Sequence, residues 1–275
     1  MTDLTAIILA YNEEKNIKHC IESIRGIAKR IVVIDSFSKD NTVKIAEEEG
    51  AEVLQHAWKN YSTQYNWGVE NAKIETTWIL RIDADERISP EAAKEIEMIC
   101  SKGDPELNGI IVRFTVTFLG KELKHGGIYP FRKLMIYKNG KGYMENRNMD
   151  EHIILSEGKA VELKNDSYHY DYKGLTEWID KHNKYSSREV LDYTENRREE
   201  ISNLNFTAKI KRWIKYKCYY NLPLGTRAHL YYLYRYYLRL GFLDGKEGKI
   251  FCFLQAYWYR YLVDAKIYEN EMNSK

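Results

Sequence analysis

The first 100 residues alternate between short apolar runs and helical patterns, and this alternation constrains the fold most. Continuous apolar runs at residues 4–9 and 31–34 are typical of strands that are buried on both faces, and residues 53–54 and 78–82 predict two further strands. Between these runs, apolar residues recur at the spacing of amphipathic helices. The pattern predicts an α/β fold with a parallel sheet that helices cover on both faces.

Local capping signals predict where the helices begin and end. Asn12 is predicted to cap the first helix, and Asp40 the second, which Gly50 ends. Ser89-Pro90 predicts a further helix start, because proline is tolerated in the first turn.

The pattern changes in the second half of the chain. Residues 105–165 predict mixed or antiparallel strands that complete the sheet, with a hairpin turn at Asn139-Gly140. From Leu175 onward, helical patterns dominate. The 275 residues, 44% of them hydrophobic, suffice for one large domain with an appendage.

Charge is distributed unevenly along the chain. Residues 205–275 carry 13 Lys and Arg against 5 Asp and Glu, whereas the preceding residues have a net charge of −6. A basic tail on an acidic body suggests that the tail meets phosphate, in lipid headgroups or in nucleic acid.

The cysteines and the apolar segments indicate a cytoplasmic protein. The four cysteines are isolated from one another, which fits reduced thiols better than disulfides or a metal site. The N-terminus enters a strand-like run directly, so we expect no signal peptide. No uncharged apolar stretch reaches the ~18 residues that a membrane-spanning helix needs.

Polar clusters follow three of the predicted strands. They are Tyr11-Asn12-Glu13, Asp35-Ser36 and Asp83-Ala84-Asp85. Parallel sheets bind ligands beyond the carboxyl ends of their strands, so we expect these clusters to form one site.

The acidic pair of the third cluster suggests a metal site. In extended backbone, Asp83 and Asp85 point the same way, so both carboxylates could bind a Mg²⁺ or Mn²⁺ held by a diphosphate. The alternative is a solvated acidic turn, which is common, but the position at a buried strand end favours a site. Asp35 could contact a base or ribose, or only cap the following turn, and its sequence leaves both open.

Three segments resemble signatures of the family 2 inverting glycosyltransferases. Residues 7–14 (Ile-Ile-Leu-Ala-Tyr-Asn-Glu-Glu) resemble the opening of that family, and residues 34–42 (Ile-Asp-Ser-Phe-Ser-Lys-Asp-Asn-Thr) its second signature. Residues 78–86 (Trp-Ile-Leu-Arg-Ile-Asp-Ala-Asp-Glu) resemble its D-x-D strand. Within the family, the chain is similar to bacterial lipopolysaccharide-core and capsule enzymes, most strongly over residues 4–90.

The resemblance implies a GT-A fold, a Rossmann-like α/β fold that binds a nucleoside-diphosphate sugar, with UDP as the first expectation. It implies a divalent metal, Mn²⁺ or Mg²⁺, bound by Asp85, with Asp83 shared between metal and ribose and Asp35 near the nucleoside. The family often has a basic residue where Tyr65 stands, so a diphosphate contact is missing here or supplied elsewhere. The donor-binding residues implied in this chain are Ala10, Tyr11, Asn12, Glu13, Asp35, Gln64, Asn66, Asp83 and Ala84.

Inversion needs a general base that deprotonates the attacking hydroxyl. Residues 149–152 (Met-Asp-Glu-His) resemble the acidic motif of the family, which makes Glu151 the first candidate, Asp150 the second and His152 a third. The alternative is a polar strand start. A late histidine completes the metal shell in several GT-A enzymes, and His169 is the candidate here, or else a packed, hydrogen-bonded residue.

The resemblance divides the chain into a catalytic domain over residues 1–172 and a helical extension over 173–275. Residues 1–100 would bind the donor and residues 101–172 the acceptor. Twelve of the 23 tyrosines lie beyond residue 205, among basic residues. Because Tyr, Trp, Lys and Arg settle at headgroup depth, we expect an interfacial pair of helices on the inner leaflet. These aromatics could instead pack on the catalytic domain or on another subunit.

The resulting hypothesis is a hexosyltransferase on the inner face of the plasma membrane that acts on a glycan or lipid-linked acceptor. A sugar-phosphate nucleotidyltransferase would want a glycine-rich basic loop after the first strand, whereas the carboxylates at Glu13 and Glu14 oppose a triphosphate. A nucleic-acid binder is a third reading, but the acidic body and the lack of a recognised motif count against it. We therefore expect no nucleic-acid partner. The sequence leaves the oligomeric state open.

Overall fold

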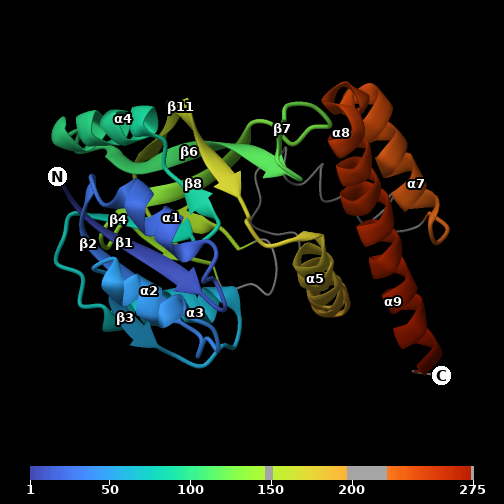
Figure 1. The fold of residues 1–275 in the computed structure, drawn as a ribbon, viewed down its shortest axis with the longest axis horizontal. Coiled ribbons are helices and arrows are strands. Elements are labelled where there is room, and N and C mark those ends of the chain that lie inside the picture. The colour runs from blue at the N-terminus through green and yellow to red at the C-terminus, as the bar shows by residue number, and fades with distance from the viewer. Residues whose placement is uncertain (146–150, 197–221, 274–275) are drawn as a thin grey trace. The chain divides into compact units, whose positions relative to one another are not determined.

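The structure is a computed structural model that describes residues 1–145, 151–196 and 222–273 (Figure 1). The chain forms two compact units. The first comprises Met1–Glu122 and Ile128–Gly174, and the second Leu123–Gly127 and Leu175–Lys275. Leu123–Gly127 thus leaves the first unit and joins the second, which the sequence pattern did not indicate. The functional division into a catalytic domain and an extension stays a prediction.

The N-terminal half of the first unit contains the predicted parallel strands. Strand β1 (Thr2–Ala10) pairs in parallel with β2 (Ala28–Asp35) on one side and β4 (Trp78–Asp83) on the other. Strand β3 (Glu52–Gln55) extends the sheet beyond β2. The residues of β1, β2 and β4 are mostly buried, which explains why these strands are rich in apolar residues, whereas no residue of β3 is buried.

The remaining strands make the sheet mixed, as predicted. Strand β8 (Phe131–Lys138) runs antiparallel to β4 and to β6 (Leu107–Phe118). Strand β11 (Lys159–Tyr170) lies parallel to β6, and its end pairs with β5 (Glu86–Arg87). The order in the sheet is β3-β2-β1-β4-β8-β6-β11-β5. The other described strands of this part are β7 (Lys121–Leu123), which pairs with β6, and β9 (Gly142–Met144) with β10 (Ile153–Leu155), which pair with each other.

Helices cover both faces of this sheet. Residues of α1 (Ile17–Ile24), α2 (Thr42–Glu48) and α4 (Pro90–Ser101) join the core on one face, where the even-numbered side chains of β1 point. Helix α3 (Tyr61–Asn71) packs on the other face against Ile7. Alternate side chains of a buried strand therefore enter different cores, as the pleat requires.

Two helix starts differ from the prediction. Asn12 does not cap α1, which begins at Ile17. Instead Asn12 has a left-handed backbone, with φ of 53°, and its Oδ1 accepts a hydrogen bond from the Lys39 amide at 2.8 Å. The side chain links two loops, and that contact outcompetes the local cap. Ser89 caps α4 as predicted, because its Oγ accepts from the Ala92 amide. Asp40 accepts from the Thr42 amide, but the N-cap position of α2 is Asn41, one residue later than predicted.

The described part of the second unit is helical. Helix α5 (Leu175–Asn196) packs against α9 (Tyr259–Asn273) through Val190 and three apolar residues of α9. No helix among the described residues is long and apolar enough to cross a membrane. The other segments are α7 (Thr226–Leu233), the π-helical η2 (Tyr234–Leu238), the 3₁₀ turn η3 (Gly241–Asp244), α8 (Gly245–Cys252) and the π-helical η4 (Phe253–Trp258).

His182 makes the stability of the second unit depend on pH. Its ring stacks on Trp178 with centroids 3.5 Å apart, and its Nδ1 donates to the Trp178 carbonyl oxygen at 2.8 Å. Burial lowers the pKa of His182 from 6.5 to about 4, so the fold favours the neutral ring. This stabilisation is complete above the unfolded pKa and is lost as pH falls toward 4. We expect a loss of about 2 kcal/mol between pH 7 and 5.

Urea unfolding at pH 7 and pH 5 measures this loss. His182→Asn keeps a donor for the Trp178 carbonyl but has no titrating ring, so the variant should lose about 2 kcal/mol less than the wild type over that range. An equal loss in both proteins would show that His182 is not the group responsible.

Candidate active site

The strand registers bring the three predicted polar clusters to one edge of the sheet. Ala10 of β1 lies opposite Asp35 of β2, and Leu9 lies opposite Asp83 of β4. All three strands are parallel, so their carboxyl ends point the same way. The three strands therefore end within one residue of each other in register, and the polar clusters begin at the same edge of the sheet.

The loops after β1 and β2 are joined by hydrogen bonds and expose two aromatic side chains. The Asn12 amide donates to Ser38 Oγ at 2.9 Å, and the Lys39 amide donates back to Asn12. Asn12 and Phe37 both have left-handed backbones, with φ of 53° and 59°. The side chains of Tyr11 and Phe37 are about half exposed beside these contacts. An exposed phenylalanine with a left-handed backbone at the edge where the predicted clusters meet suggests a functional constraint.

Asp35 is fully buried and supports the turn that follows it. Its Oδ1 accepts from the Ser38 hydroxyl at 2.5 Å, and its Oδ2 accepts from the Ser38 amide and from Gln55 Nε2. Gln64 is also buried, and its amide contacts Ser36 Oγ at 3.0 Å and His56. The structure thus shows the capping role of Asp35, while its contact with a nucleoside stays a prediction.

The two residues after Gln64 on α3 face different surroundings. Tyr65 is fully buried in the core, and its hydroxyl lies 3.0 Å from that of Tyr137. Asn66 donates to the Met144 carbonyl at 3.1 Å. The position where the family often has a basic residue therefore points into the core here, so Tyr65 provides no phosphate contact.

Asp83 lies in a buried group of charges that we name the charge quartet: Arg81, Asp83, Glu86 and Lys133. Asp83 Oδ2 accepts from Arg81 at 2.9 Å and from Lys133 at 3.2 Å, and its Oδ1 accepts from Tyr61 at 2.5 Å. Glu86, whose exposed fraction is zero, pairs with Lys133 and accepts from the Asp83 amide. Burial raises the pKa of Asp83, but Arg81 and Lys133 outweigh it and hold that pKa well below the usual range.

Sequence reasoning missed three of these residues and Tyr61. Arg81 carried a usable signal, because an arginine inside a strand buried on both faces must be paired with an anion. Lys133 and Glu86 had no comparable signal. Lys133 reaches Asp83 only because β8 pairs with β4, a contact between residues 50 apart in the chain.

Asp85 lies beside His169. The Asp85 Oδ2 is 3.6 Å from His169 Nε2, and the Tyr170 amide donates to the Asp85 carbonyl at 2.9 Å. The pairing of β11 with β5, in which His169 lies opposite Glu86, brings the histidine there. Two of the three predicted metal ligands are thus neighbours, whereas Asp83 is held by the charge quartet.

Glu13 adds a second acidic group close to Asp85. Its carboxylate pairs with Lys173 at 2.5 Å and accepts from Asn16 at 2.8 Å. Burial raises the pKa of Glu13; Lys173 opposes this shift, and the charge of Asp85 adds to it. Glu13 and Asp85 are thus close enough for their charges to interact.

The donor set fits a metal that is shared with a substrate. Among the described residues, no three His, Cys, Asp or Glu side chains gather closely enough to hold a metal by themselves. Mg²⁺ commonly uses one or two carboxylates and takes its other ligands from phosphates and water, and imidazole suits Mn²⁺ as well. Asp85 and His169 fit such a site, with a diphosphate as the remaining donor.

The residues proposed for the base are only partly placed. Asp150 lies outside the described residues. Glu151 is half-buried and lies two residues before the start of β10. The backbone amide and the Nδ1 of His152 lie 3.1 and 3.2 Å from Glu145 Oε1. Which of the three acts as base stays a prediction.

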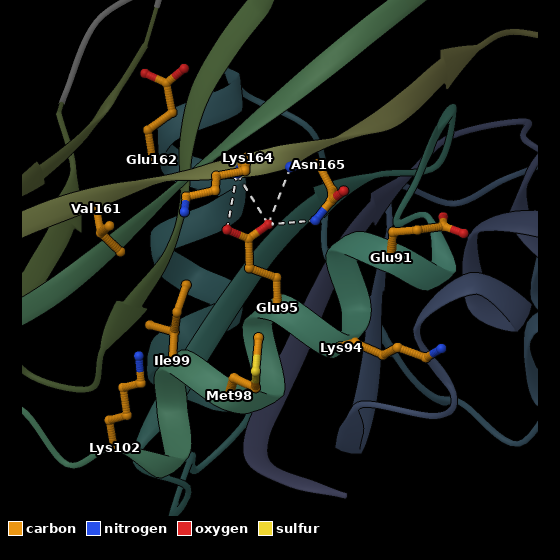
Figure 2. A pocket seen from close by; sticks show the side chains of 10 residues that line it. All are labelled: Glu91, Lys94, Glu95, Met98, Ile99, Lys102, Val161, Glu162, Lys164 and Asn165. Atoms are coloured by element: carbon orange, nitrogen blue, oxygen red, sulfur yellow. Dashed lines mark hydrogen bonds between the residues drawn. The ribbon is translucent and has the colours of Figure 1, made fainter.

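A hollow of about 520 Å³ lies between α4 and β11, away from the predicted residues (Figure 2). Figure 2 shows Glu95 at its centre, where its carboxylate accepts from the amides of Lys164 and Asn165 and from the Asn165 side chain. Both lysine and glutamate side chains line the hollow, so its charge is mixed. None of the predicted site residues lines it.

Comparison with known families identifies the class of enzyme. Residues 5–148, more than half of the chain, match the family model described as glycosyl transferase family 2. The chain belongs to glycosyltransferase family 2. The predicted family is thereby confirmed, and the chain is a glycosyltransferase.

Two relatives are similar to this glycosyltransferase over nearly its whole length. An uncharacterized glycosyltransferase of Rickettsia felis is 28% identical and covers 100% of this chain and 93% of its own. The lipopolysaccharide core biosynthesis glycosyltransferase LpsC of Rhizobium meliloti is 28% identical, over 97% of this chain and 92% of its own.

A solved structure confirms the GT-A fold. The mannosyltransferase PcManGT of Pyrobaculum calidifontis, in complex with GDP-Man and Mn²⁺, aligns with a TM-score of 0.56 at 12% identity. The alignment covers 97% of this chain and 87% of PcManGT. At this identity the likeness shows the fold alone, an α/β mixed sheet with a helical C-terminal region.

Proposed function

We propose that this glycosyltransferase moves a hexose, with inversion, from a nucleoside-diphosphate sugar to a glycan or lipid-linked acceptor in lipopolysaccharide or cell-surface polysaccharide synthesis. UDP is the nucleotide that we expect first. The similarity to LpsC supports the acceptor class. We further propose that it works in the cytoplasm, on the inner face of the plasma membrane.

The donor nucleotide would bind across the ends of β1, β2 and β4. The exposed rings of Tyr11 and Phe37 can stack on a base, since aromatic faces pair well with other rings. Asp35, at the end of β2, would contact the nucleoside. Gln64 holds the Ser36 turn in place. The backbone at Ala10 and Ala84 belongs to the same strand ends, next to the space where the diphosphate would lie.

The charge quartet would prepare Asp83 for the ribose and the diphosphate. Arg81 and Lys133 hold the pKa of its carboxyl group well below the usual range, so the carboxylate is ionised at neutral pH. Lys133 is also our candidate for the phosphate contact that Tyr65 does not make, because its ammonium group lies at Asp83 and its side chain is partly exposed.

Asp85 and His169 would hold the Mn²⁺ or Mg²⁺ together with the diphosphate. When bound, the metal neutralises the charge that builds on the departing nucleoside diphosphate. The acceptor hydroxyl attacks the anomeric carbon while the bond from that carbon to the diphosphate oxygen breaks. The hydroxyl proton passes to Glu151 or Asp150, and attack from the opposite face inverts the anomeric centre.

The observation that carries this proposal is the pair formed by Asp85 and His169 at the edge where the three strand ends meet. Calorimetric titration of the protein with UDP-sugars and GDP-sugars, with and without Mn²⁺, tests it. We expect one donor to bind with Mn²⁺ and to lose most of its affinity in EDTA. Failure of every nucleotide-sugar to bind in Mn²⁺ would refute the proposed function.

The base can be separated from the donor site by substitution. Glu151→Gln should lower transfer to a lipopolysaccharide-containing envelope fraction by about 10²- to 10⁴-fold, because the amide cannot accept the proton. Its donor affinity should stay within about twofold, since Glu151 would contact the acceptor. Asp150→Asn is the matched variant. Full transfer by Glu151→Gln together with a loss in Asp150→Asn would move the role to Asp150.

A further inference from the structure

A short corner of the second unit exposes an unusual number of large apolar side chains. The corner, residues 237–243, joins α7 to α8 through η2 and η3 (Figure 1). Leu238 has an exposed fraction of 76%, and four other large apolar side chains of the corner have fractions above 40%. These five side chains are Tyr237, Leu238, Leu240, Phe242 and Leu243. Single exposed apolar residues are ordinary, but a contiguous group marks an interaction surface.

Buried polar contacts hold the corner in place. Asp244 accepts from the amides of Lys124 and His125, and from His125 Nδ1 at 2.7 Å. The Gly126 amide donates to the Arg239 carbonyl at 2.8 Å, and Arg235 Nε donates to the Gly126 carbonyl at 2.6 Å. The loop Leu123–Gly127 thus braces the corner from inside the same unit.

Close packing and backbone strain fix the direction of the exposed side chains. A Cβ at Gly241 would lie 2.7 Å from Cys252 Sγ and 2.9 Å from the Arg235 carbonyl oxygen, so only glycine fits there. Leu240 has a φ of 60°, a conformation that bulky residues rarely adopt. A tightly held turn that presents a strained leucine to solvent is better explained by a ligand than by loose packing.

The charges around the corner have one predominant sign. Arg239, Lys246 and Lys249 are exposed, whereas the carboxylate of Asp244 is buried among donors. Glu247 is half-buried. Leucine, phenylalanine and tyrosine side chains inside a cationic rim match the boundary between headgroups and acyl chains of an anionic bilayer.

We propose that residues 237–243 dock the protein onto an anionic phospholipid bilayer. The five apolar side chains enter the headgroup region, and Arg239, Lys246 and Lys249 contact lipid phosphates. This inference specifies the membrane part of the proposed function and does not depend on the donor site. A protein partner or a second copy of the chain would leave the cationic rim unexplained unless that partner were acidic.

Co-sedimentation with vesicles at low salt tests the docking surface. The wild type should bind phosphatidylcholine vesicles that contain phosphatidylglycerol, and bind pure phosphatidylcholine vesicles much more weakly. Leu238→Glu/Phe242→Glu should weaken binding to the anionic vesicles by about tenfold or more. Lys246→Gln/Lys249→Gln should weaken it roughly tenfold, because each lost charge near an anionic surface costs several-fold.

The matched control is Met272→Glu. Met272 is 58% exposed and lies near the C-terminal end of α9. The corner lies before α8, so the helical segments α8, η4 and α9 separate it from Met272 along the chain. Its binding should stay within about twofold of the wild type. Circular dichroism checks that each variant folds. If the corner double variant does not fold, the lysine variant decides alone, since both lysines are exposed.

Absence of vesicle binding by the wild type, or equal binding by the lysine variant, would overturn the inference. So would a corner variant that changes the oligomer mass in light scattering and leaves vesicle binding intact, because the surface would then be a contact between copies. Donor binding is measured in solution without vesicles. A protein that binds vesicles through the corner but binds no nucleotide-sugar would refute the proposed function and leave the docking surface standing.

Discussion

Asp85→Asn should lower metal-dependent turnover of the donor by roughly three orders of magnitude, because it removes the carboxylate that would hold the metal on the diphosphate. Asparagine keeps the size of the side chain but lacks the negative charge. Asp85 lies next to His169, and its charge is close enough to Glu13 to raise the pKa of the Glu13 carboxyl group. Removal of its charge should therefore weaken cation binding and leave the surrounding fold in place.

Isothermal titration with Mn²⁺ in the presence of the nucleoside diphosphate measures the binding part of this effect, and donor hydrolysis measures the catalytic part. Asp180→Asn, at an exposed position of α5, is the control for loss of one carboxylate. The assignment of Asp85 would be wrong if Asp85→Asn kept Mn²⁺ affinity and turnover close to those of the control.

The parallel half of the fold was predictable because its signals are local. Strands β1, β2 and β4 are buried on both faces, so each reads as an apolar run, and right-handed crossovers leave few ways to order them. The meeting of Asp35 and Asp83 at one edge followed from this topology. The helix cap at Asn12 was mispredicted because the side chain had a second partner, Lys39, in a loop that local patterns cannot see.

The other half of the site depends on contacts between distant residues. His169 reaches Asp85 through the pairing of β11 with β5, and Lys133 reaches Asp83 through β8. Periodicity carries no information about either pairing; the resemblance to a family suggested His169 but not Lys133. Sequence reasoning also missed Tyr61, because a tyrosine at a helix start has many ordinary roles.

The charge quartet also explains why the two aspartates of the D-x-D segment differ. Asp83 and Glu86 face Arg81 and Lys133, so the four charges balance inside the protein. Asp85 stands outside this group and next to an imidazole, which carries a full charge only when protonated. A cation from solution therefore gains more at Asp85 than at Asp83.

Lys133→Met should destabilise the protein by about 3–5 kcal/mol, because it leaves the carboxylate of Glu86 buried without its cation. Methionine approximates the apolar stem of lysine, so little packing is lost. The exposed fraction of Glu86 is zero, and that of the Lys133 side chain is 18%. Because the Glu86 carboxylate is inaccessible to solvent, water can solvate it only if the site rearranges.

Urea unfolding followed by tryptophan fluorescence measures the cost. Lys141→Met breaks the pair of Lys141 with Glu157, in which both side chains are about half exposed, and should cost less than about 1 kcal/mol. Lys133→Met/Glu86→Gln should recover more than half of the loss, since no buried carboxylate then remains unpaired at position 86. Equal costs for Lys133→Met and Lys141→Met, or no recovery in the double variant, would show that the ion pair does not hold this edge together.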